Sequence, residues 1–196
     1  MKNKDNGIKY IFTKGLTLIF IGLAFNLLAL PVIGLTSPFW AILVSIIILA
    51  GYYYLMFTLG RLSADYCFKA YKRNLLREKQ GEQVLKAQKL LEYQWWKGLV
   101  FSSLYYVWQV IVLSLALILK NKILNAIISF YNLSFANILN AAGAINNLLD
   151  ITPFSPLFFI FIIAAPLAFE AGYIFNGEIL KRQHQEIKME LKLFNS

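Results

Sequence analysis

The chain has 196 residues, of which 59% are hydrophobic and 16% aromatic, and its formal net charge is +9. Soluble domains are about 45–50% apolar, so the composition argues against a soluble domain. Positive charge is typical of nucleic-acid-binding proteins, but the basic residues here flank apolar segments, and we therefore expect no nucleic-acid partner. Cys67 is the single cysteine, which excludes an internal disulfide and a multi-cysteine metal site.

Four apolar segments are each long enough to cross a bilayer. They lie at about residues 15–35, 39–60, 99–119 and 153–175. The hydrocarbon core of a bilayer is about 30 Å thick and takes about 20 helical residues. Because lipid offers the backbone no hydrogen-bond partner, such segments cross it as helices. We predict an all-α, polytopic membrane protein, a single integral membrane domain (1–196) built as a bundle of four transmembrane helices.

The first two segments are joined by a very short turn, Leu35–Pro38. Proline restricts the residue before it and so ends a helix there. We therefore expect the first two helices to pack against each other as a tight antiparallel hairpin.

The segment 61–98, between the second and third spans, is predicted to be a cytoplasmic amphipathic helical hairpin. Apolar residues recur at helical spacing on both sides of Gly81, at Ala64, Cys67, Phe68, Tyr71, Leu75, Val84, Ala87, Leu91 and Trp95. Such a stripe is typical of helices that lie on a membrane surface, and a solvated connector is the alternative. Trp95, Trp96 and Lys97 are candidate interfacial anchors. The basic residues of this segment would attract anionic lipid headgroups.

Residues 121–150 form an asparagine-rich outer segment, and no charged residue occurs from Ile123 to Leu149. Apolar residues recur there at helical spacing, at Phe135, Ile138, Leu139, Ala142, Ile145 and Leu149. This pattern predicts a pair of short helices on the outer surface, or a re-entrant dip into the membrane. A fifth span is the alternative, but it would carry the basic C-terminal tail to the outer face.

All of the 19 basic residues except Lys120 and Lys122 are predicted to lie on one side of the membrane. They are Lys2, Lys4, Lys9 and Lys14, then Arg61, Lys69, Lys72, Arg73, Arg77, Lys79, Lys86, Lys89 and Lys97, and finally Lys181, Arg182, Lys188 and Lys192. Cytoplasmic loops carry the excess of lysine and arginine. We therefore expect a multi-pass protein of the cell membrane with both termini in the cytoplasm.

Glu170 is the one charged residue of the fourth span. It lies about five residues from the cytoplasmic end of that span, or about 8 Å deep at a rise of 1.5 Å per residue. An ionisable group in a span is costly, and it commonly pairs with another group or belongs to a relay. Arg61, just beyond the second span, is the nearest candidate partner by depth. Glu170 is therefore a candidate proton or cation relay, with a structural ion pair or a carboxylate that reaches the interface as the alternatives.

Other residues within the spans are suited to contacts between helices. Ala164, Ala168 and Gly172 follow one another at four-residue spacing and form a candidate helix-packing seam, because small residues let a neighbouring helix approach closely. Asn26 and Gln109 lie near the middle of their spans. We expect their amides to form hydrogen bonds between helices, and the alternative is that they line a polar path.

No sequence motif for catalysis is present. The chain has no nucleophile elbow, no glycine-rich phosphate loop and no HExxH, and the single histidine, His184, has no second ligand near it for a metal. We predict no catalytic residue, no cofactor and no metal. The first hypothesis is an assembly, regulatory or accessory subunit of a membrane complex, whose partner is another membrane protein or a second copy. The alternative is a small oligomeric transporter or channel subunit that uses Glu170, Asn26 and Gln109.

Overall fold

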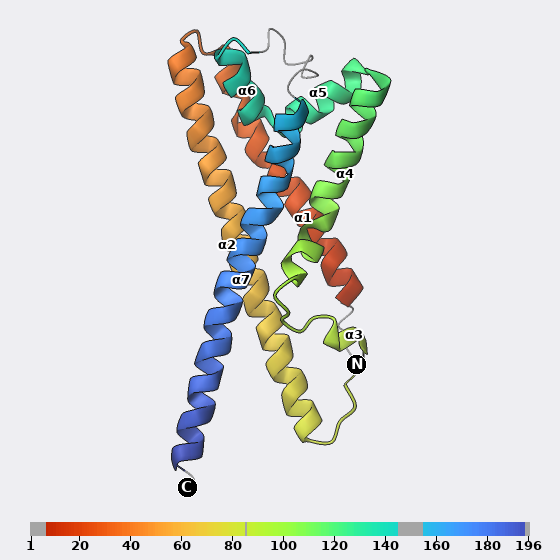
Figure 1. Ribbon diagram of the computed structural model, residues 1–196, viewed down its shortest axis with the longest axis vertical. Coiled ribbons are helices and arrows are strands. Elements are labelled where there is room, and N and C mark those ends of the chain that lie inside the picture. The colour runs from red at the N-terminus through yellow and green to blue at the C-terminus, as the bar shows by residue number, and fades with distance from the viewer. Residues whose placement is uncertain (1–6, 85, 145–154, 195–196) are drawn as a thin grey trace.

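The computed structural model describes residues 7–84, 86–144 and 155–194, and every regular element in these ranges is helical (Figure 1). The elements are α1 (Gly7–Leu28), the 3-10 helix η1 (Leu30–Gly34), α2 (Pro38–Lys79), α3 (Lys86–Lys89), α4 (Lys97–Leu119), α5 (Lys122–Tyr131), α6 (Leu133–Ala141) and α7 (Ser155–Phe194). The predicted all-α class is confirmed.

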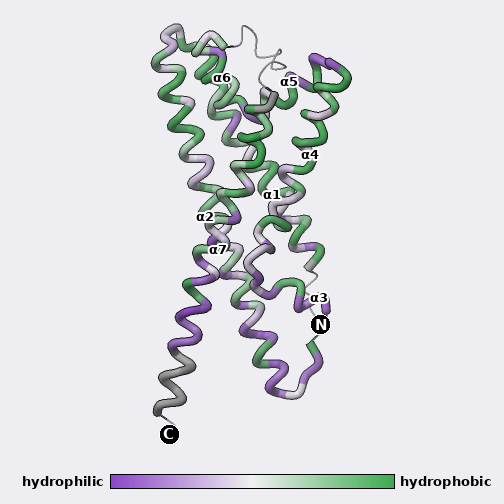
Figure 2. Tube along the Cα trace, viewed as in Figure 1, coloured by the Kyte–Doolittle hydropathy of each residue, from purple (hydrophilic) through white to green (hydrophobic). Residues whose placement is uncertain are grey.

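Four stretches of the described chain are long and apolar enough to cross a membrane, namely Ile8–Gly34, Pro38–Lys79, Lys97–Leu119 and Leu157–Glu186. Each overlaps one predicted span, so the prediction of a multi-pass membrane protein with four such helices is confirmed. Figure 2 shows hydrophobic residues along the upper and middle parts of the helices and hydrophilic residues near the lower end. We call this lower end, where α2 and α7 finish, the charged end.

α2 and α7 run in the same direction and cross near their middles (Figure 1). Gly60 of α2 and Gly172 of α7 lie at the crossing. A Cβ atom on Gly60 would be 2.0 Å from the carbonyl oxygen of Phe169, and one on Gly172 would be 1.9 Å from that of Phe57. No side chain fits in these gaps, so the two glycines are what allows the backbones to meet. Close approach at small residues is a main basis of helix association in lipid.

α1 packs mainly on α4 rather than on α2. A Cβ atom on Gly15 would be 2.5 Å from Cβ of Leu104, and one on Gly22 would be 2.9 Å from the ring of Tyr105. The expectation of a tight hairpin between the first two helices is wrong, because the glycine face of α1 is directed at α4. The short turn keeps α1 and α2 adjacent in the chain, and they touch through the ring pairs Tyr10–Tyr66 and Phe25–Tyr52, but the contact is smaller than that between α1 and α4.

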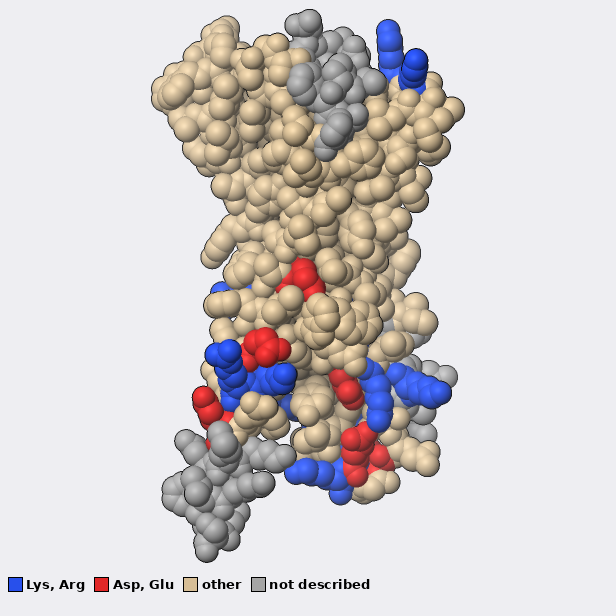
Figure 3. All heavy atoms as spheres, viewed as in Figure 1, with Lys and Arg blue, Asp and Glu red and all other residues tan. Residues whose placement is uncertain are grey.

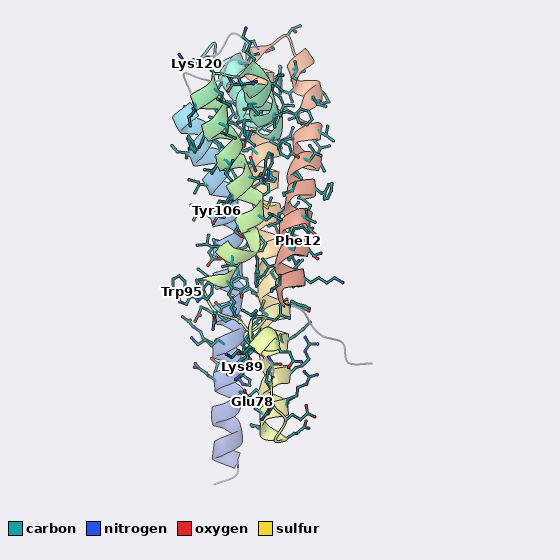
Figure 4. The ribbon with its side chains drawn as sticks, turned by 90° about the vertical axis from the view of Figure 1, so that its right-hand side faces the viewer. Phe12, Glu78, Lys89, Trp95, Tyr106 and Lys120 are labelled. Atoms are coloured by element: carbon teal, nitrogen blue, oxygen red, sulfur yellow. The ribbon has the colours of Figure 1, made fainter. Side chains whose placement is uncertain are left out.

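The expected hairpin of two helices in residues 61–98 takes another form. Its first half is the uninterrupted continuation of α2, and the described residues of its second half include the short helix α3 and the start of α4. The connector folds back along the end of α2, because Asn74 donates hydrogen bonds to the carbonyl oxygen of Gln88 (3.2 Å) and to Oε1 of Glu92 (2.9 Å). Lys89 and Glu78 form an ion pair at 2.9 Å, near the lower end in Figure 4. This contact raises the pKa of Lys89, because Glu78 accepts its hydrogen bond and attracts its charge.

α5 and α6 form a bent pair rather than a straight helix. Their axes turn by 102° between Tyr131 and Leu133, and both outer ends of the pair lie at the end of the bundle opposite the charged end (Figure 1). The pair therefore enters the bundle and returns to the same end, an arrangement that fits either of the two predictions, a pair of helices on the outer surface or a re-entrant dip. We call the bend at Asn132 the elbow.

The buried apolar residues form two clusters. One cluster joins α1, α2, α4 and α7 around Phe101, Phe169 and Tyr173. The other joins α4, α5, α6 and α7 around Leu113, Ile128 and Phe158. Figure 3 shows most of the acidic and basic side chains on the lower part of the visible face, with further basic side chains at the top. The two apolar clusters hold the helices together. The charges of the bundle are concentrated at one end.

Candidate functional site

The elbow is held in place by Asn26, which lies near the end of α1. The side-chain oxygen of Asn26 accepts a hydrogen bond from the backbone N–H of Leu133 at 3.0 Å. Its amide nitrogen donates to the carbonyl oxygens of Tyr131 and, at 2.8 Å, Gly22. A sharp bend leaves backbone groups without helical partners, and inside a membrane such groups must be satisfied by protein. Asn26 does this on both sides of the bend.

Gln109 of α4 reaches the same elbow from another direction. It is fully buried, its oxygen accepts a hydrogen bond from Asn132 at 3.3 Å, and its nitrogen donates to the carbonyl oxygen of Tyr105 at 3.3 Å. Asn137 of α6 adds a third contact, a hydrogen bond of 3.0 Å to the carbonyl oxygen of Ala29. The structure thus brings together at the elbow the side chains of Asn26 and Gln109, the two amides that were predicted to form hydrogen bonds between helices.

A small cavity with a mixed polar and apolar lining lies beside the elbow. It has a volume of about 20 Å³ and is lined by residues that include Asn26, Tyr52, Tyr105, Asn132 and Ser134. The hydroxyls of Tyr52 and Tyr105 are hydrogen-bonded to each other across α2 and α4. A polar cavity of 10–15 Å³ or more is large enough for about one water molecule. The cavity is therefore of a size for water and not for an organic substrate.

Glu170 lies inside the bundle, with 6% of its surface exposed. Its Oε2 atom lies against Gly98, the second residue of α4, at 1.9 Å from the position that a Cβ atom of Gly98 would take. The N-terminal end of a helix carries a partial positive charge, and the backbone amide of Leu99 is nearby. Among the described residues, neither carboxylate oxygen has a hydrogen-bond partner. The carboxylate thus faces the first turn of α4 and not a cation.

Arg61 does not meet Glu170. Its guanidinium lies over the ring of Phe175, at 5.9 Å from the ring centre. Asn176 of α7, which is not among the residues predicted from the sequence, donates hydrogen bonds to the carbonyl oxygen of Arg61 (3.1 Å) and to Oδ1 of Asp65 (2.9 Å). The sequence feature that could have identified Asn176 is its position directly after a long apolar run. Arg61 and Glu170 have similar depths, but they face different directions around their helices.

The three candidate seam residues, Ala164, Ala168 and Gly172, do not all face the same neighbour. Gly172 lies at the crossing with α2, and Ala168 is partly buried against the cluster around Phe169. Ala164 is partly buried. The partner glycine on α2, Gly60, is not among the seam residues predicted from the sequence, although Gly60 and Ala64 also follow one another at four-residue spacing.

The three candidate anchors also differ from one another. Trp95 and Trp96 are 63% and 44% exposed, as residues at a membrane interface are. Lys97 is buried instead, and its ammonium donates hydrogen bonds to the carbonyl oxygens of Glu92 (2.7 Å) and Lys89 (3.3 Å). Lys97 therefore closes the connector onto the start of α4 and does not reach outward.

Comparisons of this chain with models of known protein families, with curated proteins and with solved structures found no match. In the part of the chain that the structure describes, no three His, Cys, Asp or Glu side chains are grouped so that they could hold a metal ion.

Proposed function

We propose that this chain is a non-catalytic integral membrane protein that serves as an assembly, regulatory or accessory subunit of a membrane complex. The observation that supports this proposal is what the buried amides of Asn26 and Gln109 bind. Asn26 and Gln109 direct hydrogen bonds at the elbow, so these two polar groups inside the bundle support its fold. Such an interior suits a protein that acts through its surfaces.

The proposed location is the cell membrane, with the charged end and both termini in the cytoplasm. The clustering of basic residues supports this orientation, since positive charge is retained on the cytoplasmic side. Lys120 and Lys122, which flank the start of α5, are the basic residues at the opposite end. Lys120 is labelled near the top of Figure 4.

The surface proposed for contact with a partner is the charged end. α2 has 42 residues and is therefore about 63 Å long at 1.5 Å per residue, twice the thickness of a bilayer core of about 30 Å. The stretch from Arg61 to Lys79 would extend into the cytoplasm and present its basic residues to anionic lipid headgroups. It would also be accessible to a partner, either another membrane protein or a second copy of this chain.

Purification in a mild detergent tests the proposal. A tagged chain, solubilised from its native membrane after brief chemical cross-linking, should bring down one other membrane protein or a second copy of itself in a fixed ratio. A variant in which Lys72 and Arg73 are both replaced by Ser should recover less partner, while the matched pair Lys120→Ser and Lys122→Ser at the opposite end should not change recovery. Recovery of a single monodisperse chain from all samples would argue against the proposal.

The alternative function is a small transporter or channel subunit. The observation that favours it is the Glu170 carboxylate, which is buried and has no hydrogen-bond partner among the described residues. Flux of protons or small cations into proteoliposomes would support this alternative if Glu170→Gln abolished the flux and Glu186→Gln, at an exposed position of α7, preserved it. Absence of flux, or the same flux in both variants, would remove the proposed relay.

A further inference from the structure

We propose that the groove between α1 and α4 binds one acyl chain of an anionic phospholipid, whose headgroup lies at the charged end of the bundle. This inference rests on the proposed membrane function and makes its lipid contact specific. The groove has a volume of about 310 Å³ and is lined by Ile8, Ile11 and Phe12 of α1 and by Ser103, Leu104 and Val107 of α4.

The groove follows from the way in which the two helices pack. α1 and α4 touch where Gly15 meets Leu104 and where Gly22 meets Tyr105. On the N-terminal side of these contacts α1 carries Ile8 and Phe12, which are 68% and 56% exposed. Figure 4 shows the two helices side by side, with Phe12 marking α1 and Tyr106 marking α4. The apolar space is therefore open to the surrounding lipid.

A lipid chain fits this groove better than the helix of a partner does. Helices associate in membranes where small residues let the backbones approach, and a helix with its side chains is about 10 Å wide. The glycines of α1 are already used against α4, and the lining is bulky except for Ser103, whose hydroxyl donates to the carbonyl oxygen of Val100 at 2.7 Å. A flexible chain can follow bulky side chains, and the volume is at the lower end of the 300–1,000 Å³ found for small-molecule pockets.

The charges near the groove favour an anionic headgroup. α1 contains Lys9 and Lys14 and no acidic residue, and Lys9, which follows the groove residue Ile8, is exposed. Trp95 and Trp96 are exposed just before α4 begins, and indole rings favour the level of the headgroups. Lysine side chains near the surface attract acidic phospholipids. The apolar groove and the exposed Lys9, which follows the groove residue Ile8, are thus complementary to the two parts of one such lipid.

Native mass spectrometry of the protein from mixed phosphatidylglycerol and phosphatidylcholine vesicles tests this site. The wild type should retain one phosphatidylglycerol after detergent washing. Ser103→Trp, which fills the groove, should lower the retained fraction by about tenfold, and Val107→Trp should do the same if Ser103→Trp does not fold. Ile111→Trp is the control, because Ile111 is 53% exposed on the same helix but does not line the groove.

Lys9→Gln should reduce the preference for phosphatidylglycerol over phosphatidylcholine without abolishing retention of a lipid. Equal retention by the groove variants and Ile111→Trp would overturn the proposal, and so would a second copy of the chain bound in place of lipid in the wild type. These outcomes are independent of partner recovery from native membranes, which tests the proposed function separately.

Discussion

The carboxylate of Glu170 occupies the space that a side chain on Gly98 would need. A Cβ atom on Gly98 would lie 1.9 Å from Oε2 and 3.0 Å from Cδ of Glu170. The two residues are 72 positions apart in the sequence, yet they join the middle of α7 to the first turn of α4. This contact brings an acidic group to the positive end of a helix dipole, and it makes glycine necessary at position 98.

Gly98→Ala should therefore destabilise the protein through Glu170. In the Glu170→Ala background the same substitution should cost about 0.5–3 kcal/mol less, which is the usual coupling between residues in contact. Thermal unfolding in detergent of the two single variants and the double variant measures this coupling. Equal costs of Gly98→Ala in both backgrounds would show that the two residues are not coupled.

Asn26→Ala should loosen the elbow. It removes the acceptor of the Leu133 N–H and a donor to the Tyr131 carbonyl, and a buried polar group left unsatisfied costs about 1–3 kcal/mol. Thermal unfolding, together with proteolysis at residues 121–144, would report the change. Asn140→Ala is the matched control, because Asn140 is exposed on α6, and its effect should be small. Similar losses in both variants would count against the assigned role of Asn26.

Gly60→Ala should force α2 and α7 apart. The new Cβ atom would lie 2.0 Å from a backbone oxygen that cannot move by itself, and overpacking of this kind costs about 1–3 kcal/mol or more. Gly51→Ala on the same helix is the control, since its Cβ atom would be 3.7 Å from the ring of Phe25. That control should leave stability unchanged or raise it by about 0.5–1 kcal/mol, because alanine is the better helix former. A neutral Gly60→Ala would contradict the described crossing.

Tyr93 should make stability sensitive to alkaline pH. Its hydroxyl donates a long hydrogen bond of 3.4 Å to Glu178, and burial, together with the charge of Glu178, raises the pKa of the Tyr93 phenol. A raised pKa in the folded state means that this contribution is complete below the unfolded pKa of about 10 and is lost as the pH rises through the higher folded value. The stability of the wild type should therefore fall more steeply than that of Tyr93→Phe above about pH 10. Parallel curves between pH 8 and about pH 12 would rule out this contribution.

The four long helices were predictable because each is an apolar run of the length that a bilayer requires. The continuation of α2 to Lys79 was not predictable. The composition changes from apolar to amphipathic near Arg61, and this change suggested a boundary between two helices. A helix needs no break where its surroundings change from lipid to water. Gly81, with φ of +79°, is where the chain does turn, as the sequence indicated.

The pairing of helices and the partners of the polar residues could not be predicted. The depth of a residue along a span follows from its number, and by this criterion Arg61 and Glu170 lie at the same level. The direction in which a side chain points also depends on the rotation of its helix about the helix axis. In the structure Arg61 points toward Phe175 and not toward Glu170. Asn26 and Gln109 were recognisable as buried amides in need of partners. The elbow itself could not be predicted, because its bend depends on side chains from α1 and α4. The sequence indicated only an uncharged, asparagine-rich segment at this place.

Cysteine labelling in intact cells tests most directly the central claim, that this bundle spans the membrane with its charged end in the cytoplasm. The native Cys67 is fully buried, so the wild type should remain unlabelled by an impermeant maleimide. Lys122→Cys should be labelled in intact cells, and Gln80→Cys, at the exposed end of α2, should be labelled only after the cells are permeabilised. Labelling of Gln80→Cys in intact cells would contradict the account.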